Sequence, residues 1–279
     1  MNKKLVFFDI DGTLLNNKKT INESTIKAID DLKHKGFIFC IATGRGLSEG
    51  IIEIANIAKL NGFLILSNGN YIWDLENEKL LTIGYSISSD VVSGFFNAAQ
   101  KIKRQFNICF SDGTCKNIYF GNDINSDIKD PKFYLIGPTI YKFDEVLSVE
   151  EMTKKEVMHV SIKAEADLIK KTYPELKKFE ENQLAQVSNV LDIYIEAEAF
   201  GVSKWSGAQY LQNKLGISNE NSYAFGDSKN DIILLSNIGN SICMGNGEPE
   251  VKNVAKYVIG DNNSDAIAEF LYKLVENEK

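Results

Sequence analysis

Apolar residues fill positions 5 to 8 of the chain, and the motif Asp9-Ile10-Asp11-Gly12-Thr13 follows them at once. An apolar run without polar alternation is typical of a strand that is covered on both faces, as in a parallel sheet. The aspartates then lie at the carboxyl end of that strand, where open α/β sheets bind their ligands. This segment therefore predicts an α/β fold with an acidic site at one edge of its sheet.

Two carboxylates this close repel each other, by about 4 kcal/mol at about 4 Å and an effective dielectric constant near 20. A fold tolerates such a pair if a cation lies between the groups, or if one of them is kept protonated for acid–base chemistry. The alternative is that Asp11-Gly12 is only a turn signal. The segment alone leaves both readings open.

The overall charge excludes some classes of partner. The 279 residues carry 38 acidic and 31 basic side chains, for a net charge of -7. Nucleic acid and anionic membranes favour basic surfaces, so we expect neither as a partner. His34 and His159 are the only histidines and lie far apart in the sequence. A histidine metal site or a Ser-His-Asp triad is therefore not expected.

The cysteines and the apolar segments indicate the cellular compartment in which the protein is expected. The four cysteines, Cys40, Cys109, Cys115 and Cys243, show no Cys-x-x-Cys spacing. Three of them lie in apolar, strand-like runs, which suits buried free thiols in a reducing compartment. The apolar run after the basic start is too short for a signal peptide, and no apolar stretch reaches the length of a membrane span. The chain is expected to be cytoplasmic.

Strand and helix patterns alternate along the first part of the chain. Strands are expected at 5–8, 37–42 and 63–66, with helices between them, and this β-α-β-α-β order predicts a doubly wound, Rossmann-like parallel sheet. The pattern becomes less regular near residue 81. It includes helical segments at 90–103, 165–172 and 174–182 and strands at 117–120 and 157–162. We therefore predict a core of residues 1–81 and 192–279, with an inserted α+β domain at 82–191.

Four polar clusters follow strands or open a helix in the predicted core. They are Asp9 with Asp11, Thr43-Gly44, Lys204, and Asp227 with Asn230 and Asp231. The carboxyl ends of parallel strands share one edge, so the clusters after strands should converge. Each cluster also has a structural explanation. Thr43-Gly44 suits a turn, Lys204 could be exposed in a helix capped by Ser203 and closed by Gly216, and Asp227 could be a simple N-cap.

An acidic, histidine-free site of this kind suits Mg²⁺, which prefers carboxylates, water and substrate phosphate. A metal, a lysine and a hydroxyl donor together form a clamp for a phosphoryl group. Asp9 would be the nucleophile that forms an aspartyl-phosphate, and Asp11 would protonate the leaving oxygen and then activate water. No Walker-type Gly-Lys-Ser/Thr loop is present, which disfavours a P-loop NTPase.

In its motifs the chain resembles the haloacid dehalogenase (HAD) superfamily of phosphohydrolases, and within it the Cof-like branch, which has a C2-type cap between the second and third motifs. The segments that carry the resemblance are 9–15, 41–45, 201–204, 226–231 and 244–246. By this resemblance, Asp9, Asp227 and the backbone carbonyl of Asp11 would bind Mg²⁺, and Asp231 would support the metal from the second shell. The residues that would hold the phosphate are Thr43, Gly44, Lys204, Asn230 and the backbone of Ile10.

Two residues depart from the family pattern. Trp205 replaces the glycine that commonly follows the lysine of the third motif, and Asn70 replaces a small residue after Asn68-Gly69. Either substitution could reshape the substrate mouth or the hinge.

The sequence therefore predicts a Mg²⁺-dependent phosphatase whose partner is a small phosphorylated metabolite, such as a sugar phosphate. One alternative is a phosphotransferase or phosphomutase of the same fold. Another is a non-catalytic phosphate-binding protein. Neither the physiological substrate, the cap residues that select it nor the oligomeric state follows from the sequence.

Overall fold

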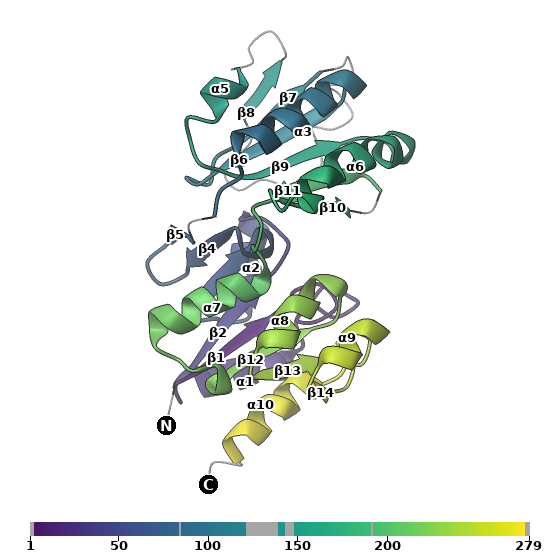
Figure 1. Cartoon of the computed structure of the whole chain (residues 1–279). Coiled ribbons are helices and arrows are strands. Elements are labelled where there is room, and N and C mark those ends of the chain that lie inside the picture. Colours follow the sequence, from purple (N-terminus) through teal and green to yellow (C-terminus); the bar gives the residue numbers. More distant parts are fainter. Residues whose placement is uncertain (1–2, 84, 121–138, 143–147, 191, 277–279) are drawn as a thin grey trace. The chain divides into compact units, whose positions relative to one another are not determined.

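The chain divides into two compact units. The computed structural model describes residues 3–83, 85–120, 139–142, 148–190 and 192–276 (Figure 1). One unit consists of residues 1–83 and 203–279, and we call it the core unit; the other, residues 84–202, is called the insert.

The core unit is built on a sheet of eight described strands in the order β14-β13-β12-β1-β2-β3-β4-β5. Neighbours from β14 to β3 are parallel, which confirms the predicted α/β class, and only β4 and β5 run antiparallel at one edge. The strands are β1 (Lys4–Phe8), β2 (Phe37–Ala42), β3 (Phe63–Leu66), β4 (Tyr71–Asp74), β5 (Lys79–Thr82), β12 (Ser222–Gly226), β13 (Asn240–Cys243) and β14 (Tyr257–Val258).

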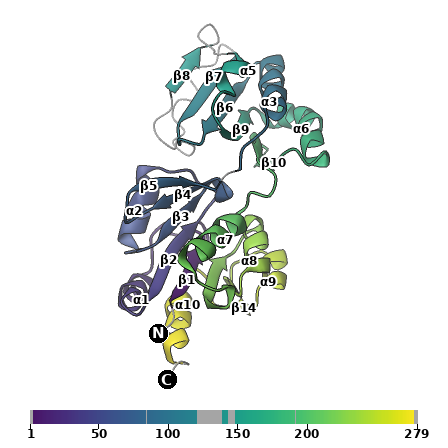
Figure 2. The same ribbon diagram turned by 60° about the vertical axis from the view of Figure 1, so that its left-hand side comes forward.

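Helices cover both faces of this sheet, as Figure 2 shows. Leu5 and Phe7 of β1 share a core cluster with residues of α7, α8 and α9. On the other face, Phe225 of β12 makes an edge-to-face contact with Phe270 of α10, and α10 packs against α1. The central strand β1 is therefore buried on both sides, which explains its unbroken apolar sequence. The helices are α1 (Glu23–Lys33), α2 (Glu49–Ile57), α7 (Lys204–Leu215), α8 (Ile232–Asn237), α9 (Pro249–Val254) and α10 (Ala266–Glu276).

The ends of α7 follow from its sequence. The Ser203 side chain accepts a hydrogen bond from the backbone N–H of Ser206, and the Ser206 hydroxyl oxygen accepts one from the backbone N–H of Ser203. Gly216 ends the helix with a φ of 64°, a left-handed conformation that glycine adopts without cost. The predicted N-cap at Ser203 and helix end at Gly216 are both correct, and the N-cap fixes Lys204 as the first residue of the helix.

The insert is a second sheet of six described strands in the order β10-β11-β9-β6-β7-β8. All neighbours are antiparallel except β7 and β8. Helices α3 and α6 pack on one face of it through a separate apolar core (Figures 1 and 2). The elements are α3 (Ser89–Ile102), β6 (Gln105–Phe110), β7 (Cys115–Tyr119), β8 (Thr139–Lys142), α5 (Val149–Met152), β9 (Val157–Lys163), α6 (Ala166–Glu181), β10 (Gln186–Val190) and β11 (Tyr194–Glu198).

Two predictions about the insert are wrong. The return to the core was placed at residue 192, but β11 pairs with β9 and β10, so the structure places the change of unit at residue 203. The break predicted at Pro174 is absent, because α6 continues through it. Ile169, Thr172 and Leu176 are buried along this helix, and their packing outweighs the hydrogen bond that proline removes.

The cysteines differ from expectation as well. Cys109 of β6 and Cys115 of β7 form a disulfide, whereas Cys40 and Cys243 are free and buried as predicted. The two bonded cysteines face each other across adjacent antiparallel strands, a relation that requires knowledge of the strand register. Among the described helices, none has the length and hydropathy needed to cross a membrane.

Candidate active site

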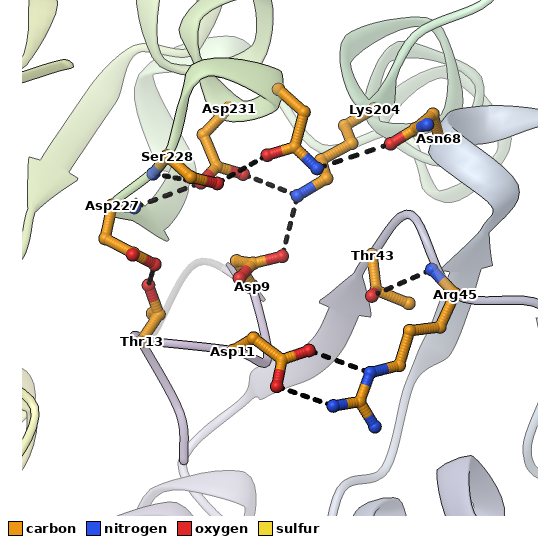
Figure 3. A network of polar contacts seen from close by, with 11 residues as sticks. Asp9, Asp11, Thr13, Thr43, Arg45, Asn68, Lys204, Asp227, Ser228 and Asp231 are labelled. Atoms are coloured by element: carbon orange, nitrogen blue, oxygen red, sulfur yellow. Dashed lines mark hydrogen bonds and ion pairs between the residues drawn. The ribbon is translucent and has the colours of Figure 1, made fainter. Parts of the chain in front are cut away.

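Acidic residues from both ends of the chain meet at the carboxyl edge of the core sheet (Figure 3). Asp9 follows β1 and Asp227 follows β12, and these two strands are parallel neighbours. One carboxylate oxygen each from Asp9, Asp227 and Asp231 lie within 4.8 Å of one another. The predicted convergence of segments more than 200 residues apart is therefore observed.

Lys204 lies in the middle of this cluster. Its Nζ donates hydrogen bonds to Asp9 Oδ1 at 2.7 Å and to Asp231 Oδ1 at 2.6 Å, and its side chain is fully buried. Burial works against the ammonium charge, but the two carboxylates outweigh it and raise the pKa of Lys204. Lys204 is therefore a permanent buried cation, not an exposed lysine that merely tolerates the start of a helix.

The carboxyl groups around Lys204 retain excess negative charge. Burial raises the pKa of Asp9 to about 7, although the charge of Lys204 works in the opposite direction. The pKa of Asp227 is also raised, mainly by burial, while the hydrogen bond from Thr13 opposes that shift. One buried lysine thus does not balance the carboxylates gathered here. A second positive charge would favour their ionised forms.

Asp231 is held from two sides. Its Oδ2 accepts hydrogen bonds from the backbone N–H groups of Asp227 and Ser228, at 3.0 and 3.1 Å. Its other oxygen accepts from Lys204, and the residue is fully buried. With both oxygens engaged, Asp231 is suited to position Lys204 and the loop that carries Asp227.

The Gly12-Thr13 segment fits closely against Asp227. The Thr13 hydroxyl donates a hydrogen bond to Asp227 Oδ1 at 2.6 Å. Gly12 has a φ of 82°, and a Cβ atom at this position would lie 2.3 Å from Asp227 Oδ2. Glycine is thus required both for the backbone conformation and for the approach of the carboxylate. Thr13 directly follows the Asp-x-Asp-Gly motif, but this role was not predicted from the sequence.

Asp11 is turned away from the carboxylate cluster and faces Arg45 (Figure 3). Arg45 donates from Nε to Asp11 Oδ2 at 2.8 Å and from a terminal nitrogen to Oδ1 at 2.5 Å, and Lys19 Nζ lies 3.2 Å from Oδ1. Partial burial raises the pKa of Asp11, but Arg45 and Lys19 outweigh it and lower that pKa overall. In a strand, residues two apart point to the same side. This alternation does not apply to Asp9 and Asp11, because β1 ends at Phe8.

Arg45 is a residue whose role the sequence analysis missed. It stands beside Thr43-Gly44 in an acidic chain, where any cation near the predicted site was a candidate for anion binding. Its backbone N–H donates to the Thr43 hydroxyl oxygen at 3.2 Å. The backbone of Arg45 is therefore fixed within the loop after β2, while its guanidinium group is held by Asp11.

The loop after β2 lies against a second loop after β3. The backbone N–H of Asn68 donates to the carbonyl oxygen of Thr43 at 3.0 Å, and Asn68 has a φ of 52°. The side chain of Asn230 donates to Asn68 Oδ1 at 3.5 Å, and a Cβ atom on Gly44 would lie 3.1 Å from the same oxygen. Asn68, in the loop after β3, is thus bonded to the loop after β2 and to the loop after β12. Only the folded chain reveals this role. Ile10 and Thr43 are buried, and Asn230 is exposed.

The two residues that depart from the family pattern lie in the packed interior of the core unit. Asn70 is fully buried and its side-chain amide donates to the carbonyl oxygen of Ser67 at 2.8 Å. Trp205 is partly buried against the apolar cluster that α7 shares with the sheet.

The donor set fits a hard divalent cation. It consists of carboxylate oxygens without histidine or cysteine, the set that Mg²⁺ prefers. Asp9 and Asp227 each bring a carboxylate oxygen to within 4.8 Å of the other, so both could hold one such ion. Both oxygens of Asp231 are already engaged by Lys204 and by backbone N–H groups. Burial is the main cause of the raised pKa values of Asp9 and Asp227, and a bound cation would oppose it by favouring the ionised carboxylates.

Comparisons with known proteins agree with this geometry. A model of the haloacid dehalogenase-like hydrolase family matches residues 6–271. The chain is 30% identical to the 5-amino-6-(5-phospho-D-ribitylamino)uracil phosphatase YcsE of Bacillus subtilis, over 95% of this chain and 93% of that protein. It is 24% identical to the HMP-PP phosphatase of Klebsiella pneumoniae, over 98% of this chain and 96% of that protein.

A solved structure extends the match to the fold. The HAD subclass IIB sugar phosphatase BT4131 superposes with a TM-score of 0.73 at 24% identity, over 98% of this chain and 99% of that one. The similarity therefore includes the insert as well as the core unit.

Proposed function

The chain belongs to the haloacid dehalogenase-like hydrolases, as a phosphatase of the Cof-like branch, and we propose that it hydrolyses small phosphomonoesters with Mg²⁺ through an aspartyl-phosphate on Asp9. The observation that supports this most strongly is the buried Lys204, which hydrogen-bonds to Asp9 and Asp231 beside Asp227. Such an arrangement provides a nucleophile, a fixed positive charge and oxygen ligands at one point.

In this proposal the ligands of the ion are Asp9, Asp227 and the backbone carbonyl of Asp11. When bound, Mg²⁺ would neutralise the phosphate and favour the ionised form of the nucleophile. Asp231 would hold Lys204 and the Asp227 loop in place. The groups assigned to the phosphate oxygens are Thr43, Gly44, Lys204, Asn230 and the backbone of Ile10.

The chemistry then takes place in two half-reactions. Asp9 attacks phosphorus, the ester P–O bond breaks, and Asp11 gives a proton to the departing oxygen. Asp11 next removes a proton from water, which attacks the phosphorus of the aspartyl-phosphate and releases orthophosphate and free Asp9. Arg45 and Lys19 hydrogen-bond to Asp11 and lower its pKa. Both cations must therefore turn away so that Asp11 can take up, from solvent, the proton that it gives to the departing oxygen.

The substrate class is also a proposal. The relatives named above include a 5-amino-6-(5-phospho-D-ribitylamino)uracil phosphatase and an HMP-PP phosphatase, and a sugar phosphatase shares the fold. We therefore assign a small phosphorylated metabolite, such as a sugar phosphate, and place the enzyme in the cytoplasm. A phosphomutase is less well supported, because mutases of this superfamily commonly have a helical cap between the first two motifs. The interval between Asp11 and Thr43 contains a single helix, α1, followed by strand β2.

A panel of phosphorylated metabolites, assayed with Mg²⁺ and with EDTA, tests this function. We expect orthophosphate release that requires Mg²⁺ and disappears in Asp9→Asn, while the exposed Asp167→Asn leaves the rate unchanged. Added sugars that accept phosphate in place of water would instead identify a phosphotransferase. Absence of any Mg²⁺-dependent turnover across the panel would leave only a phosphate-binding role.

A further inference from the structure

The turn that follows β3 in the core unit has a strained backbone. Ser67, Asn68 and Gly69 adopt φ angles of 47°, 52° and 112°, so three consecutive residues are left-handed. For Ser67 and Asn68, which carry a Cβ atom, this conformation is sterically unfavourable. Such strain persists only where the surrounding structure holds it, and it gathers at functional sites. The turn is therefore expected to do more than connect β3 to β4.

Hydrogen bonds on both sides hold the turn in this conformation. The backbone N–H groups of Ser67 and Asn68 donate to the carbonyl oxygens of Arg45 and Thr43, at 2.9 and 3.0 Å. The Ser67 carbonyl oxygen accepts from the backbone N–H and from the side-chain amide of Asn70, at 3.2 and 2.8 Å. The turn is thus bonded to the loop after β2, and Asn70, which departs from the family pattern, closes it from within.

Gly69 brings the same turn against the start of α7. A Cβ atom on Gly69 would lie 2.2 Å from the carbonyl oxygen of Ser203, the N-cap residue of the helix that begins with Lys204. Only glycine allows this approach. The turn therefore contacts the loop that carries Thr43 and the helix that carries Lys204, two residues assigned to the phosphate.

The side chain of Asn68 reaches two more residues that are assigned to the phosphate. A Cβ atom on Gly44 would lie 3.1 Å from Asn68 Oδ1. The Asn230 amide donates a hydrogen bond to the same oxygen at 3.5 Å (Figure 3). Asn68 Oδ1 therefore lies against Gly44 on one side and Asn230 on the other.

The Asn230 amide is held at both of its ends. Its Oδ1 accepts a hydrogen bond from Ser228 Oγ at 2.6 Å, while its Nδ2 donates to Asn68. The two ends are chemically opposite, because the NH₂ group can donate to a phosphate oxygen and the carbonyl oxygen would repel it. Asn230 is exposed, so packing does little to fix which end faces the substrate. The two hydrogen bonds therefore determine the orientation.

We propose that Asn68 is a positioning residue for phosphate binding, whose side-chain oxygen fixes the NH₂ end of the Asn230 amide toward the Gly44 loop. It acts through Asn230 and not on the phosphate itself. An amide that is already oriented loses less conformational freedom when phosphate binds, so binding is tighter. This inference rests on the proposed function, which it deepens by adding a residue that none of the motif segments contains.

Orthophosphate binding in the presence of Mg²⁺, measured by isothermal titration calorimetry, tests the proposal. Asn68→Gly removes the side-chain oxygen, and glycine adopts the positive φ without steric cost. We expect the Kd for orthophosphate to rise about fivefold, as for the loss of one hydrogen bond between neutral groups. The midpoint of urea unfolding should be no lower than in the wild type, since the substitution relieves backbone strain.

A double-mutant cycle separates positioning from a general loosening of the turn. Asn230→Ala leaves no amide to orient, so adding Asn68→Gly to it should change the Kd by less than about twofold. Glu78→Gly is the matched control, because Glu78 is exposed and has a φ of 48° in the β4–β5 hairpin of the same unit. It should bind orthophosphate as the wild type does. An unchanged Kd in Asn68→Gly, or an equal loss in both backgrounds, would overturn the proposal.

The binding measurement also distinguishes this inference from the proposed function. If no phosphate ester is hydrolysed but orthophosphate binding follows this pattern, catalysis fails and the positioning role stands. If the enzyme is active but the wild type binds no orthophosphate, or binds it no better than Asn68→Gly, the positioning role fails and catalysis stands. In the active enzyme, Asn68→Gly should raise KM for a phosphate ester more than it lowers kcat, because Asn230 also holds the phosphate of the bound substrate.

Discussion

Gly12 and Gly216 both adopt positive φ, but only Gly12 lies against the active site. A Cβ atom on Gly12 would lie 2.3 Å from Asp227 Oδ2, whereas one on Gly216 would meet nothing within 4 Å. Both Ala substitutions should lower the free energy of unfolding by about 1 kcal/mol through backbone strain. Only Gly12→Ala should also displace Asp227 and reduce kcat by about tenfold or more. Urea unfolding and steady-state kinetics of the two variants provide the comparison, and equal kcat values would show that the close approach is unimportant.

Glu196 and His159 influence stability in opposite directions as the pH changes. Burial lowers the pKa of His159 from 6.5 to about 4 on folding, so its contribution to stability is lost as the pH decreases through that interval. Burial raises the pKa of Glu196 from 4.5 to about 7, so its contribution is lost as the pH increases between those values. Removing the ionisable group at one of the two positions should therefore reveal how the other makes stability depend on pH.

Glu196→Gln should gain stability relative to the wild type as the pH rises from 4.5 to 7. The gain should reach about 3 kcal/mol, because one pKa unit corresponds to about 1.4 kcal/mol. Urea denaturation followed by circular dichroism at several pH values measures it, with Glu181→Gln as the exposed control. A difference between variant and wild type that does not change with pH would contradict the burial of an ionisable Glu196.

At this scale the sequence predicted which residues gather but not how each one is paired. Asp9, Asp227 and Lys204 could be placed together because they follow strands or open a helix at one sheet edge. The pairing of Asp11 with Arg45 depends on the path of two loops, which spacing alone does not determine. Buried atoms such as Glu196 Oε1 and His159 Nδ1, which have no hydrogen-bond partner among the described residues, could not be predicted from the sequence either, because their positions follow from a cross-strand register.

Helix α7 connects local sequence to the active site at the scale of elements. Its capping box fixes the first turn, and Lys204 is the first helical residue. Ser203→Ala should lower the free energy of unfolding by about 1 kcal/mol. It should also reduce kcat, because a frayed first turn loosens Lys204 from Asp9 and Asp231.

Ser148→Ala is the matched control, since Ser148 caps the short helix α5 of the insert with the same capping box. It should disturb only its own helix and leave kcat unchanged. Thermal unfolding and initial rates of the two variants would test the link. An unchanged kcat in Ser203→Ala would show that Lys204 is held by its ion pairs alone.

Elements with a strong local signal were predicted correctly, and those set by tertiary packing were not. The strands of the core and the ends of α7 follow from apolar runs, caps and glycines. The continuation of α6 through Pro174 depends on packing against the sheet of the insert. The β4–β5 hairpin at the edge of the core sheet extends it in a way that the β-α-β pattern does not imply.

At the scale of the whole molecule, the insert has its own sheet and its own apolar core. Strand β11 lies between β9 and β10 in that sheet, which is why the boundary predicted at residue 192 could not hold. Sheet membership depends on pairing between distant segments, here the pairing of β11 with β9 and β10.

A fragment of residues 84–202 should therefore fold alone, and one of residues 84–191 should not. The shorter fragment lacks β11, so β10 loses its neighbour and the apolar core loses Ile195 and Ala197. Circular dichroism and urea titration should show a cooperative transition only for the longer fragment. Cooperative unfolding of both fragments would mean that β11 is dispensable to the insert.

The central claim is that Asp9 forms a covalent bond to phosphorus. The most direct measurement is mass spectrometry of the peptide that contains Asp9, after acid quench and borohydride reduction of the enzyme during turnover. The Asp11→Asn variant should accumulate the intermediate, because it cannot activate the water that hydrolyses it. We predict reduction of position 9 to homoserine, only with substrate and Mg²⁺ present. Continued release of orthophosphate with an unmodified Asp9 peptide, or a modification at another residue, would contradict the mechanism.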